Sequence, residues 1–420
     1  MIAWVLTGLF TVAGGEDRRR TVMHPMTESV VIKAAEVHVG DGRVYRPGVI
    51  VLLGSEVLSV GTDPALPLSP RIVDLGDAIV TPGLIDAACQ LGPHQATGFA
   101  EQTSEVIPHL DVADSINFES DALEILAREG VTSIYVTPEA ASVIGTRGAI
   151  IKTGGQGVSR IVEVSPTIKV NIGPESVSRG GRNSTPSNFR GITFMTRRPT
   201  TRMGAVWVFR KAFYDAIRVK SGLDSDGDPE AMAALVEVLS GQVGIRFQAR
   251  KAHDIQTAQR LCAEFGVKHV IEYGHEAFRC METLVANQTP VIYGPIYISP
   301  IGVSRSGDAP QPCLGTTNQL RDAGVKFCLT ACDLTGEDGL ARQAGKAFRH
   351  GLSLEEAMAT VTSTAADILG VSDRLGTLTR GRDADLVVWN GAPFADTSKV
   401  TMTLIDGHPV HDPDGLFEKQ

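Results

Sequence analysis

Short runs of alternating apolar and polar residues near both ends of the chain predict β-strands. From Ser29 onward, Val- and Ile-rich runs are interrupted by Gly-Asp and Gly-Ser turns, as in VVIKAAEVHVGDG and GVIVLLGSEVLSVG. This pattern is typical of antiparallel hairpins. A similar pattern of apolar runs and turns occurs near the C-terminus, in LGTLTRGRDADLVVWNG and VTMTLIDGHPVH. We therefore expect one small β-sandwich built from residues 29–79 and 374–420, the second segment ending in a short tail.

Between these flanks, strand-like apolar runs alternate with helical patterns, which indicates a parallel α/β architecture. The strand-like runs include SIYVTPE, GAIIKTGG, RGITFMT, VGIRFQAR, HVIEYG, TPVIYG and VKFCLTA. The helical runs include SDALEILAREG, PEAMAALVEVLSG, AHDIQTAQRLCAEFG and LEEAMATVTSTAADILG. No glycine-rich turn follows the first strand, so the pattern favours a (β/α)8 TIM-type barrel over residues 80–373 rather than a doubly wound sheet.

The composition sets limits on the class of partner. A chain of 420 residues with 43% hydrophobic content can bury a large core. Its net charge is −9 and its longest basic run is Arg18, Arg19 and Arg20, so we expect no nucleic-acid partner. The six cysteines are scattered and form no Cys-x-x-Cys pair, which argues against a disulfide framework.

Residues 1–28 form an N-terminal extension that begins MIAWVLTGLFTVAGG. This apolar run is too short for a membrane span. A signal peptide normally carries Lys or Arg before its apolar run, and here only the terminal amine is present. Export by a cleaved signal and a cytoplasmic protein with a frayed extension therefore both remain open.

Four motifs resemble the amidohydrolase superfamily, specifically its imidazolonepropionase-like and dipeptidase-like members. They are VTPGLIDA (80–87), SVIGTRGAIIKTGG with RRPTTRMG (142–155 and 197–204), TSTAADILGVSDRLGTLTRGRDADLVVWNGAPF (362–394) and LIDGHPVH (404–411). Together they cover nearly the whole chain after residue 29. The resemblance implies a barrel with a composite β-sandwich, and hydrolysis of carbon–nitrogen bonds in cyclic amides or peptide-like substrates.

The resemblance also implies metal ligands at the ends of the barrel strands, and the matching positions depart from the family pattern. The first strand's two histidines fall on Ala88 and Gln90, and the bridging lysine of the fourth strand falls on Thr193. The remaining positions, two histidines and an aspartate, are Gln248, Tyr273 and Cys332. A bound metal would lower the pKa of a water molecule and polarise the scissile carbonyl. We therefore expect a protein without a metal cofactor that has lost this catalysis and serves as a binding or structural protein.

A small-molecule ligand is the partner that the barrel mouth suggests. The candidate ligand-binding residues are Gln90, Lys152, Arg202, Gln248, Arg250, Tyr273 and Cys332. A buried guanidinium needs an anionic or multi-acceptor partner, which for Arg250 is Glu272, Asp333 or a ligand. Lys152 could bind an anion beside glycine amides or simply be solvated, and Arg202 could anchor a carboxylate or brace a loop. The catalytic residues of any remaining activity are unknown.

The alternative is an active hydrolase whose metal site has shifted. His94 shares strand parity with Gln90, and His275 shares it with Tyr273, so both could point toward the mouth near Asp333. Such a site would hold one divalent metal such as zinc. A metal-free mechanism is a further version of this alternative. A homodimer and a complex with an active paralogue both remain open.

Overall fold

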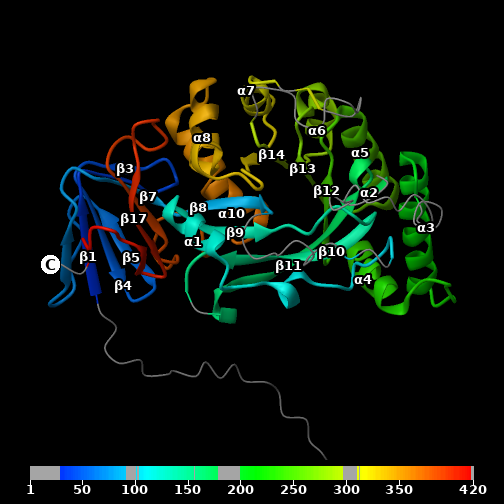
Figure 1. Cartoon of the computed structure of the whole chain (residues 1–420), viewed down its shortest axis with the longest axis horizontal. Helices are drawn as coiled ribbons and strands as arrows, with labels where there is room; N and C mark the ends of the chain where they lie inside the picture. Colours follow the sequence, from blue (N-terminus) through cyan, green and yellow to red (C-terminus); the bar gives the residue numbers. More distant parts are fainter. Residues whose placement is uncertain are drawn as a thin grey trace, which may run out of the picture.

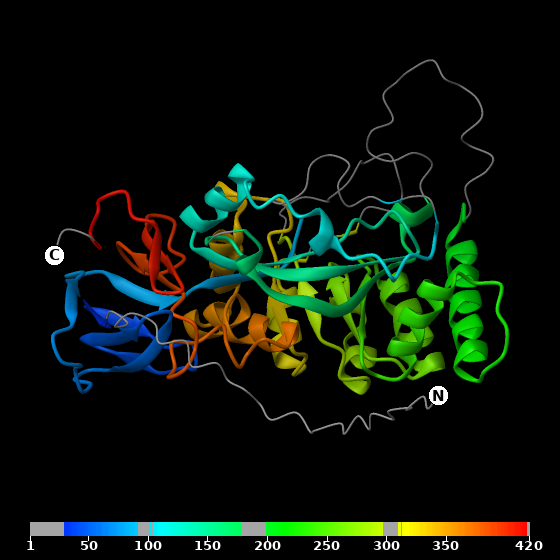
Figure 2. The same ribbon diagram turned by 90° about the horizontal axis from the view of Figure 1, so that it is seen from below.

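The computed structural model describes residues 29–417, apart from 91–100, 102–103, 156, 178–198, 297–309 and 312. The N-terminal extension, with its question of export, therefore lies outside the described residues. The first and last strands of the chain lie together at one end of the molecule, and the barrel occupies the rest (Figure 1, Figure 2). In the described ranges no helix is long and apolar enough to cross a bilayer.

Two sheets form the β domain, and the second of them joins the two ends of the chain. The first has the order β5-β4-β1-β6, with β1 (Ser29–Ala34), β4 (Gly48–Leu53), β5 (Glu56–Gly61) and β6 (Arg71–Asp74). The second has the order β18-β17-β16-β7-β2-β3, with β2 (Glu36–His38), β3 (Val44–Tyr45), β7 (Ile79–Pro82), β16 (Leu386–Trp389), β17 (Val400–Ile405) and β18 (His408–His411). Apolar side chains from both chain ends, such as Ile32, Ile50 and Leu404, pack in one core. The C-terminal strands therefore fold only together with the N-terminal ones.

The larger unit is a nearly closed eight-stranded barrel sheet, which confirms the expected mixed α/β barrel. Its strands follow chain order: β8 (Leu84–Cys89), β9 (Val131–Val136), β10 (Ile144–Lys152), β11 (Ile161–Asn171), β12 (Gly244–Gln248), β13 (His269–Tyr273), β14 (Val291–Tyr293) and β15 (Phe327–Leu329). Where the first and last strands meet, the amide of Gln90 donates to the carbonyl of Cys332 at 3.0 Å.

The third strand departs from the expected parallel pattern, because β10 runs antiparallel to both β9 and β11. Only the 3-10 turn η2 (Gly157–Arg160) lies between β10 and β11, so no helix separates these strands. Counting strands by the alternation of strand and helix consequently missed β11. The fourth strand is Ile161–Asn171, so its expected place in RGITFMT is wrong, and Thr193 itself lies outside the described residues.

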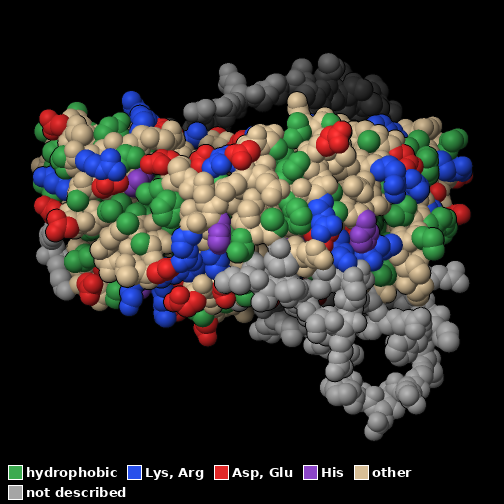
Figure 3. Space-filling view, turned by 90° about the horizontal axis from the view of Figure 1, so that it is seen from above, with side chains coloured by type: hydrophobic (Ala, Val, Ile, Leu, Met, Phe, Trp, Pro, Cys, Tyr) green, Lys and Arg blue, Asp and Glu red, His purple; other side chains and the backbone are tan. Residues whose placement is uncertain are grey.

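Helices cover the outer face of the barrel, and α3 lies at the end farthest from the β domain (Figure 1). They are α1 (Asp121–Arg128), α2 (Pro174–Val177), α3 (Arg202–Lys220), α4 (Pro229–Leu239), α5 (Ala252–Phe265), α6 (Met281–Ala286), α7 (Thr316–Asp322), α8 (Leu340–Arg349), α9 (Leu354–Thr360) and α10 (Ser363–Leu369). Three further 3-10 turns are η1 (Val112–Ser115), η3 (Ala277–Arg279) and η4 (Gly336–Asp338). Acidic and basic side chains lie mixed on the face viewed in Figure 3.

The PGLID motif closes the barrel. The Asp86 carboxylate accepts hydrogen bonds from the Thr330 hydroxyl at 2.6 Å and the Ala331 amide at 2.9 Å, which ties β8 to the end of β15. Burial raises the pKa of Asp86 above its ordinary value, although these hydrogen bonds oppose the shift. Gly83 is required by close packing, since a Cβ there would lie 2.1 Å from the Thr132 hydroxyl oxygen. The motif is therefore structural in this chain.

Lys152 does not lie at the barrel mouth, which corrects its place among the candidate ligands. Because β10 runs antiparallel, its C-terminal end reaches the opposite rim, where the β domain packs. There the buried Lys152 ammonium pairs with Asp383 at 2.7 Å and Asp385 at 3.0 Å, and also contacts Asp406. Burial raises the pKa of Asp385 to about 6 even though Lys152 opposes the shift. Lys152 thus joins the barrel to the β domain.

Replacing this ammonium should destabilise the protein strongly. We expect Lys152→Met to lower the free energy of unfolding by about 3–5 kcal/mol near neutral pH, because Asp385 is left buried without its cation. The difference in unfolding free energy should shrink as the pH falls toward about 6, because loss of Lys152 raises the pKa of Asp385 further and protonation then removes the unpaired charge from the folded state. Urea unfolding at several pH values measures both effects. Lys326→Met, which breaks the exposed pair with Asp367, is the control and should cost about 1 kcal/mol or less; equal losses would contradict the prediction.

Candidate functional site

Five of the predicted residues lie at the carboxyl ends of the barrel strands. The Cys332 thiol lies 3.5 Å from the Tyr273 hydroxyl and 3.6 Å from the Gln90 amide oxygen. The guanidinium carbon of Arg250 lies 4.5 Å from the centroid of the Tyr273 ring. Gln248, the last residue of β12, is buried beside them at the same rim. We call Gln90, Gln248, Arg250, Tyr273 and Cys332 the mouth cluster.

Two members of the mouth cluster have a left-handed backbone, Tyr273 with φ 69° and Cys332 with φ 62°. The preceding Glu272 points into the lumen, so regular strand alternation would turn Tyr273 outward. The positive φ places both consecutive side chains on the inner side. For residues other than glycine this conformation costs about 1–3 kcal/mol, and such strain is concentrated at functional sites.

Directly below the mouth, a fully buried carboxylate is shared by two cations. Glu272 on β13 accepts from Arg246 of β12 at 2.7 Å and contacts the ammonium of Lys169 of β11. The Thr137 hydroxyl donates to the same carboxylate at 3.0 Å. We call Lys169, Arg246 and Glu272 the lumen ion cluster. It was not predicted, because β11 was not recognised; the signal was a lysine within the apolar alternation of TIKVN.

The ionisation of the cluster follows from its geometry. Burial alone would raise the pKa of Glu272, but Lys169 and Arg246 together hold it down at about 2. The Arg246 guanidinium also stacks 3.5 Å from the Tyr135 ring centroid and donates to the Ala87 carbonyl. Gly148 makes room for that ring, since a Cβ there would lie 2.3 Å from Tyr135. The carboxylate is therefore ionised and fully engaged within the lumen.

Two cations lie close to the Tyr273 ring. Lys169 approaches the ring centroid to 5.3 Å and Arg250 to 4.5 Å. Burial raises the pKa of Tyr273 well above its ordinary value and raises the pKa of Cys332 to about 11. Burial, followed by the nearby Arg250 charge, lowers the pKa of His275 well below its ordinary value. At neutral pH the mouth therefore holds a protonated phenol, a protonated thiol, a neutral imidazole and a guanidinium.

The described strand ends do not fit a divalent cation. Ala88 has no donor atom, Gln90 and Gln248 offer neutral amides, Tyr273 offers a phenol, and Cys332 alone offers a thiol. Zinc and related ions prefer neutral imidazole, thiolate or carboxylate ligands. In the part of the chain that the structure describes, no group of three His, Cys, Asp or Glu side chains could hold a metal ion. Two cations beside Tyr273 also make the electrostatic environment unfavourable for a third.

The shifted-site alternative stays a prediction, because His94 lies outside the described residues. His275 is buried and is engaged by the Pro295 carbonyl, and its ring centroid lies 6.4 Å from that of Tyr293. Asp333 is exposed. A metal at this place would have to share the site with the Arg250 charge, which already disfavours protonation of His275.

Arg202 braces two helices and is not a residue of the mouth. It is the first residue of α3, where a loop was expected, and the Thr201 side chain caps this helix. The Arg202 guanidinium binds the Asp254 carboxylate of α5 through two hydrogen bonds, at 2.8 and 3.1 Å. The sequence left open whether Arg202 anchors a ligand carboxylate or braces the protein, and the structure shows a bracing contact with Asp254.

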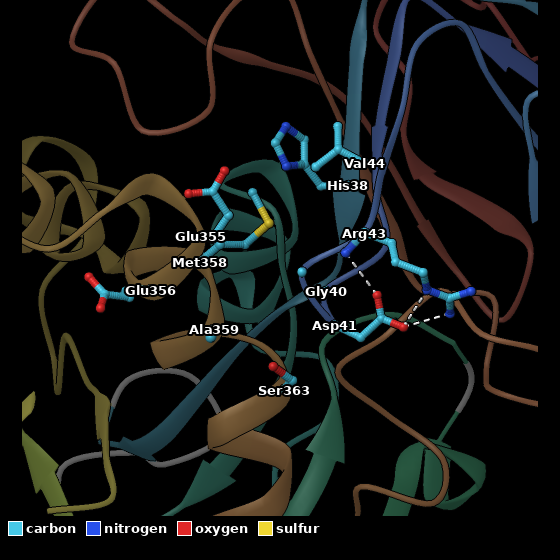
Figure 4. A pocket seen from close by; sticks show the side chains of 11 residues that line it. His38, Gly40, Asp41, Arg43, Val44, Glu355, Glu356, Met358, Ala359 and Ser363 are labelled. Atoms are coloured by element: carbon cyan, nitrogen blue, oxygen red, sulfur yellow. Dashed lines mark hydrogen bonds and ion pairs between the residues drawn. The ribbon is translucent and has the colours of Figure 1, made fainter. Parts of the chain in front are cut away.

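A second hollow lies at the other side of the barrel, between the β2–β3 turn and α9 (Figure 4). It has a volume of about 360 Å³, and its walls include His38, Asp41, Arg43, Glu355 and Met358. Asp41 binds Arg43 at 2.8 Å, and His38 lies 2.6 Å from Glu36. Asp41, Arg43 and His38 are therefore already engaged in ion pairs at this hollow.

The fold and the site define a barrel protein with a composite β domain and a candidate site at the carboxyl ends of its strands. A family model of the amidohydrolase family matches residues 334–411. A solved amidohydrolase from Thermotoga maritima is 29% identical and has a TM-score of 0.78, with 91% of this chain and 100% of that chain covered. The chain belongs to the amidohydrolase superfamily.

Two curated relatives are more distant in sequence. Amidohydrolase tasK from Hapsidospora irregularis is 24% identical over an alignment of 384 residues that covers 84% of this chain and 38% of that protein. The chain therefore spans less than two fifths of the length of that relative. Imidazolonepropionase from Acidiphilium cryptum is 22% identical over 385 residues, covering 82% of this chain and 89% of that enzyme.

Because of the lumen ion cluster, the free energy of unfolding should depend on pH in the acidic range. Glu272 has its pKa depressed from 4.5 to about 2, so its contribution is complete above pH 4.5 and is lost as the pH falls toward about 2. We expect Glu272→Gln to lower the free energy of unfolding by about 3–5 kcal/mol at neutral pH, because two buried cations lose their partner. Below pH 4.5 the difference in unfolding free energy between wild type and Glu272→Gln should become smaller, because the wild-type carboxylate is then protonated.

Thermal unfolding of wild type and Glu272→Gln across this pH range tests the expectation. The exposed Glu337 provides a matched control, and Glu337→Gln should follow the wild-type curve. A constant difference between wild type and Glu272→Gln at every pH would contradict the assignment of the shared carboxylate.

Proposed function

We propose that this chain is a non-hydrolytic, metal-independent member of the amidohydrolase superfamily that binds a small molecule at the barrel mouth. The observation that carries the proposal is the side-chain set of the mouth cluster, which consists of amides, a protonated phenol, a protonated thiol and a guanidinium. These groups bind polar ligands but do not assemble a metal-activated water.

A metal-free hydrolysis is also poorly supported by these groups. A thiol nucleophile needs a low pKa or an adjacent base. Burial instead raises the pKa of Cys332 to about 11, and its two hydrogen-bond partners are the Gln90 amide and the Tyr273 hydroxyl. Neither partner accepts a proton readily at neutral pH. Cys332 is therefore suited to packing and weak hydrogen bonding rather than to attack on a carbonyl.

The second candidate is an active hydrolase of carbon–nitrogen bonds in a cyclic amide or peptide-like substrate. It is favoured by the similarity to the Thermotoga maritima amidohydrolase and to imidazolonepropionase. It would need metal ligands that the described mouth does not provide, with His94 the first candidate. A homodimer or a complex with an active paralogue is compatible with either function.

Metal analysis distinguishes the two functions. We expect protein purified without chelator to contain no stoichiometric zinc, manganese or iron, because the described donors bind none of them well. Elemental analysis by mass spectrometry measures the metal, and treatment with chelator should leave the thermal midpoint unchanged.

Stoichiometric metal that is lost in His275→Ala or Asp333→Ala would overturn the proposal and establish the shifted site. His408→Ala is the matched control, since His408 is exposed on β18 and its loss should change nothing. Metal that is retained in all three variants would equally overturn the proposal and would place the ligands elsewhere.

A further inference from the structure

Helix α3 presents a row of large, mostly apolar side chains to solvent. The row consists of Met203, Trp207, Arg210, Tyr214 and Ile217, and we call it the α3 stripe. Its spacing of three and four residues places all five side chains on one face of the helix. Met203 is 80% exposed and Trp207 is 63% exposed. Tyr214 and Ile217 are 53% and 38% exposed. A continuous apolar patch of this kind marks an interaction surface.

The opposite face of α3 already anchors the helix to the barrel. Phe209 and Phe213 are fully buried and stack with their ring centroids 4.4 Å apart. Phe213 also packs against Phe265 of α5, with 4.9 Å between the ring centroids. The helix stands at the end of the molecule farthest from the β domain in both views (Figure 1, Figure 2). The α3 stripe is therefore not needed to hold α3 in place and faces outward.

We infer that the α3 stripe is the interface through which two copies of this chain form a twofold-symmetric dimer, with their α3 helices antiparallel. Arg210 lies halfway between Met203 and Ile217 in the sequence. A twofold axis at Arg210 would therefore bring Met203 of one copy against the partner's Ile217. It would likewise bring Trp207 against the partner's Tyr214. The inference is independent of what binds at the barrel mouth and of the metal content.

The composition and size of the α3 stripe fit the core of such an interface. Trp, Tyr, Met and Arg are the residue types enriched at protein interfaces and among the residues that dominate their binding energy. At about 150–250 Å² for each large side chain, the exposed fractions correspond to roughly 500 Å² per copy. A stable dimer buries about 800 Å² per partner. The polar rim would come from exposed neighbours on the same helix, such as Lys211 and Arg218.

The charges at the α3 stripe favour a second copy as the partner. The chain carries a net charge of −9, so two copies repel each other unless they meet at a neutral surface. Arg210 pairs with Glu264 of α5 at 2.7 Å, and Lys211 pairs with Asp215 at 2.5 Å, which leaves this surface neutral. A twofold axis at Arg210 sets the two Arg210–Glu264 pairs antiparallel, so that each guanidinium faces the partner's carboxylate.

Sedimentation velocity of the full chain over a wide range of concentrations tests the inference. We expect the wild type to be a dimer. Trp207→Glu should raise the dissociation constant by about thirtyfold or more, because it replaces a central aromatic side chain with a charge. Leu68→Glu is the matched control, since Leu68 is 98% exposed and lies in the β domain at the other end of the molecule. Its dissociation constant should equal that of the wild type.

Charge reversal separates a second copy from any other partner. Arg210→Glu and Glu264→Arg should each weaken the dimer by about tenfold or more, because four like charges then meet at the twofold axis. An equimolar mixture of the two variants should form the heterodimer, since one copy is acidic and the other basic at that place. The pair within each copy stays broken in the mixture, so this recovery reports the contact between copies. The same pair of reversals at the exposed Lys326–Asp367 pair is the control and should change nothing.

A wild-type chain that remains monomeric at every concentration overturns the inference, even if α3 captures a different protein. A dimer that Trp207→Glu leaves intact also overturns it, because that dimer uses another face. Where Trp207→Glu fails to fold, the mixed charge variants decide, and a mixture without preference for the heterodimer overturns the inference.

Discussion

One buried carboxylate, Glu272, holds together the lumen on which the rest of the barrel depends. Barrel interiors are usually filled by layers of branched apolar side chains. Here Glu272 meets Lys169 from β11 and Arg246 from β12, and a hydroxyl from the segment after β9 joins them. Arg246 continues to the carbonyl of Ala87 on β8. Because buried charges must be paired, this arrangement fixes the relative positions of β8, β11, β12 and β13 and of the segment after β9.

This use of Glu272 decides the chemistry of the layer above it. The Glu272 carboxylate is paired with Lys169 and Arg246 in the lumen. The mouth therefore contains Arg250, neutral amides and protonated side chains. The Tyr273 ring lies within 5.3 Å of Lys169 from the lumen and 4.5 Å of Arg250 from the mouth. Function resides in the side chains of a site and not in the barrel, so this set of side chains, and not the fold, decides what the mouth can bind.

The sequence pattern anticipated much of this arrangement and failed at identifiable places. The ends of β8, β12, β13 and β15 were placed correctly, which brought Gln90, Gln248, Tyr273 and Cys332 into consideration. Lys169 was missed because β10 reverses without a crossover helix, and the same reversal sends Lys152 to the β domain. Arg202 was placed in a loop, whereas it begins α3 and binds Asp254. The long helical run ending at Leu369 is two helices, because Thr362 has a non-helical backbone.

By itself, the sequence determined the strand-rich flanks and the α/β barrel between them. These features depend on local hydrophobic periodicity and on short motifs, which can be read directly from the amino-acid sequence. Only the tertiary structure decided which charges are paired, since Lys169 and Glu272 are 103 residues apart in the chain. It also decided the direction of Tyr273, because a single left-handed residue overrides the alternation from which a sequence pattern infers the side chain's face.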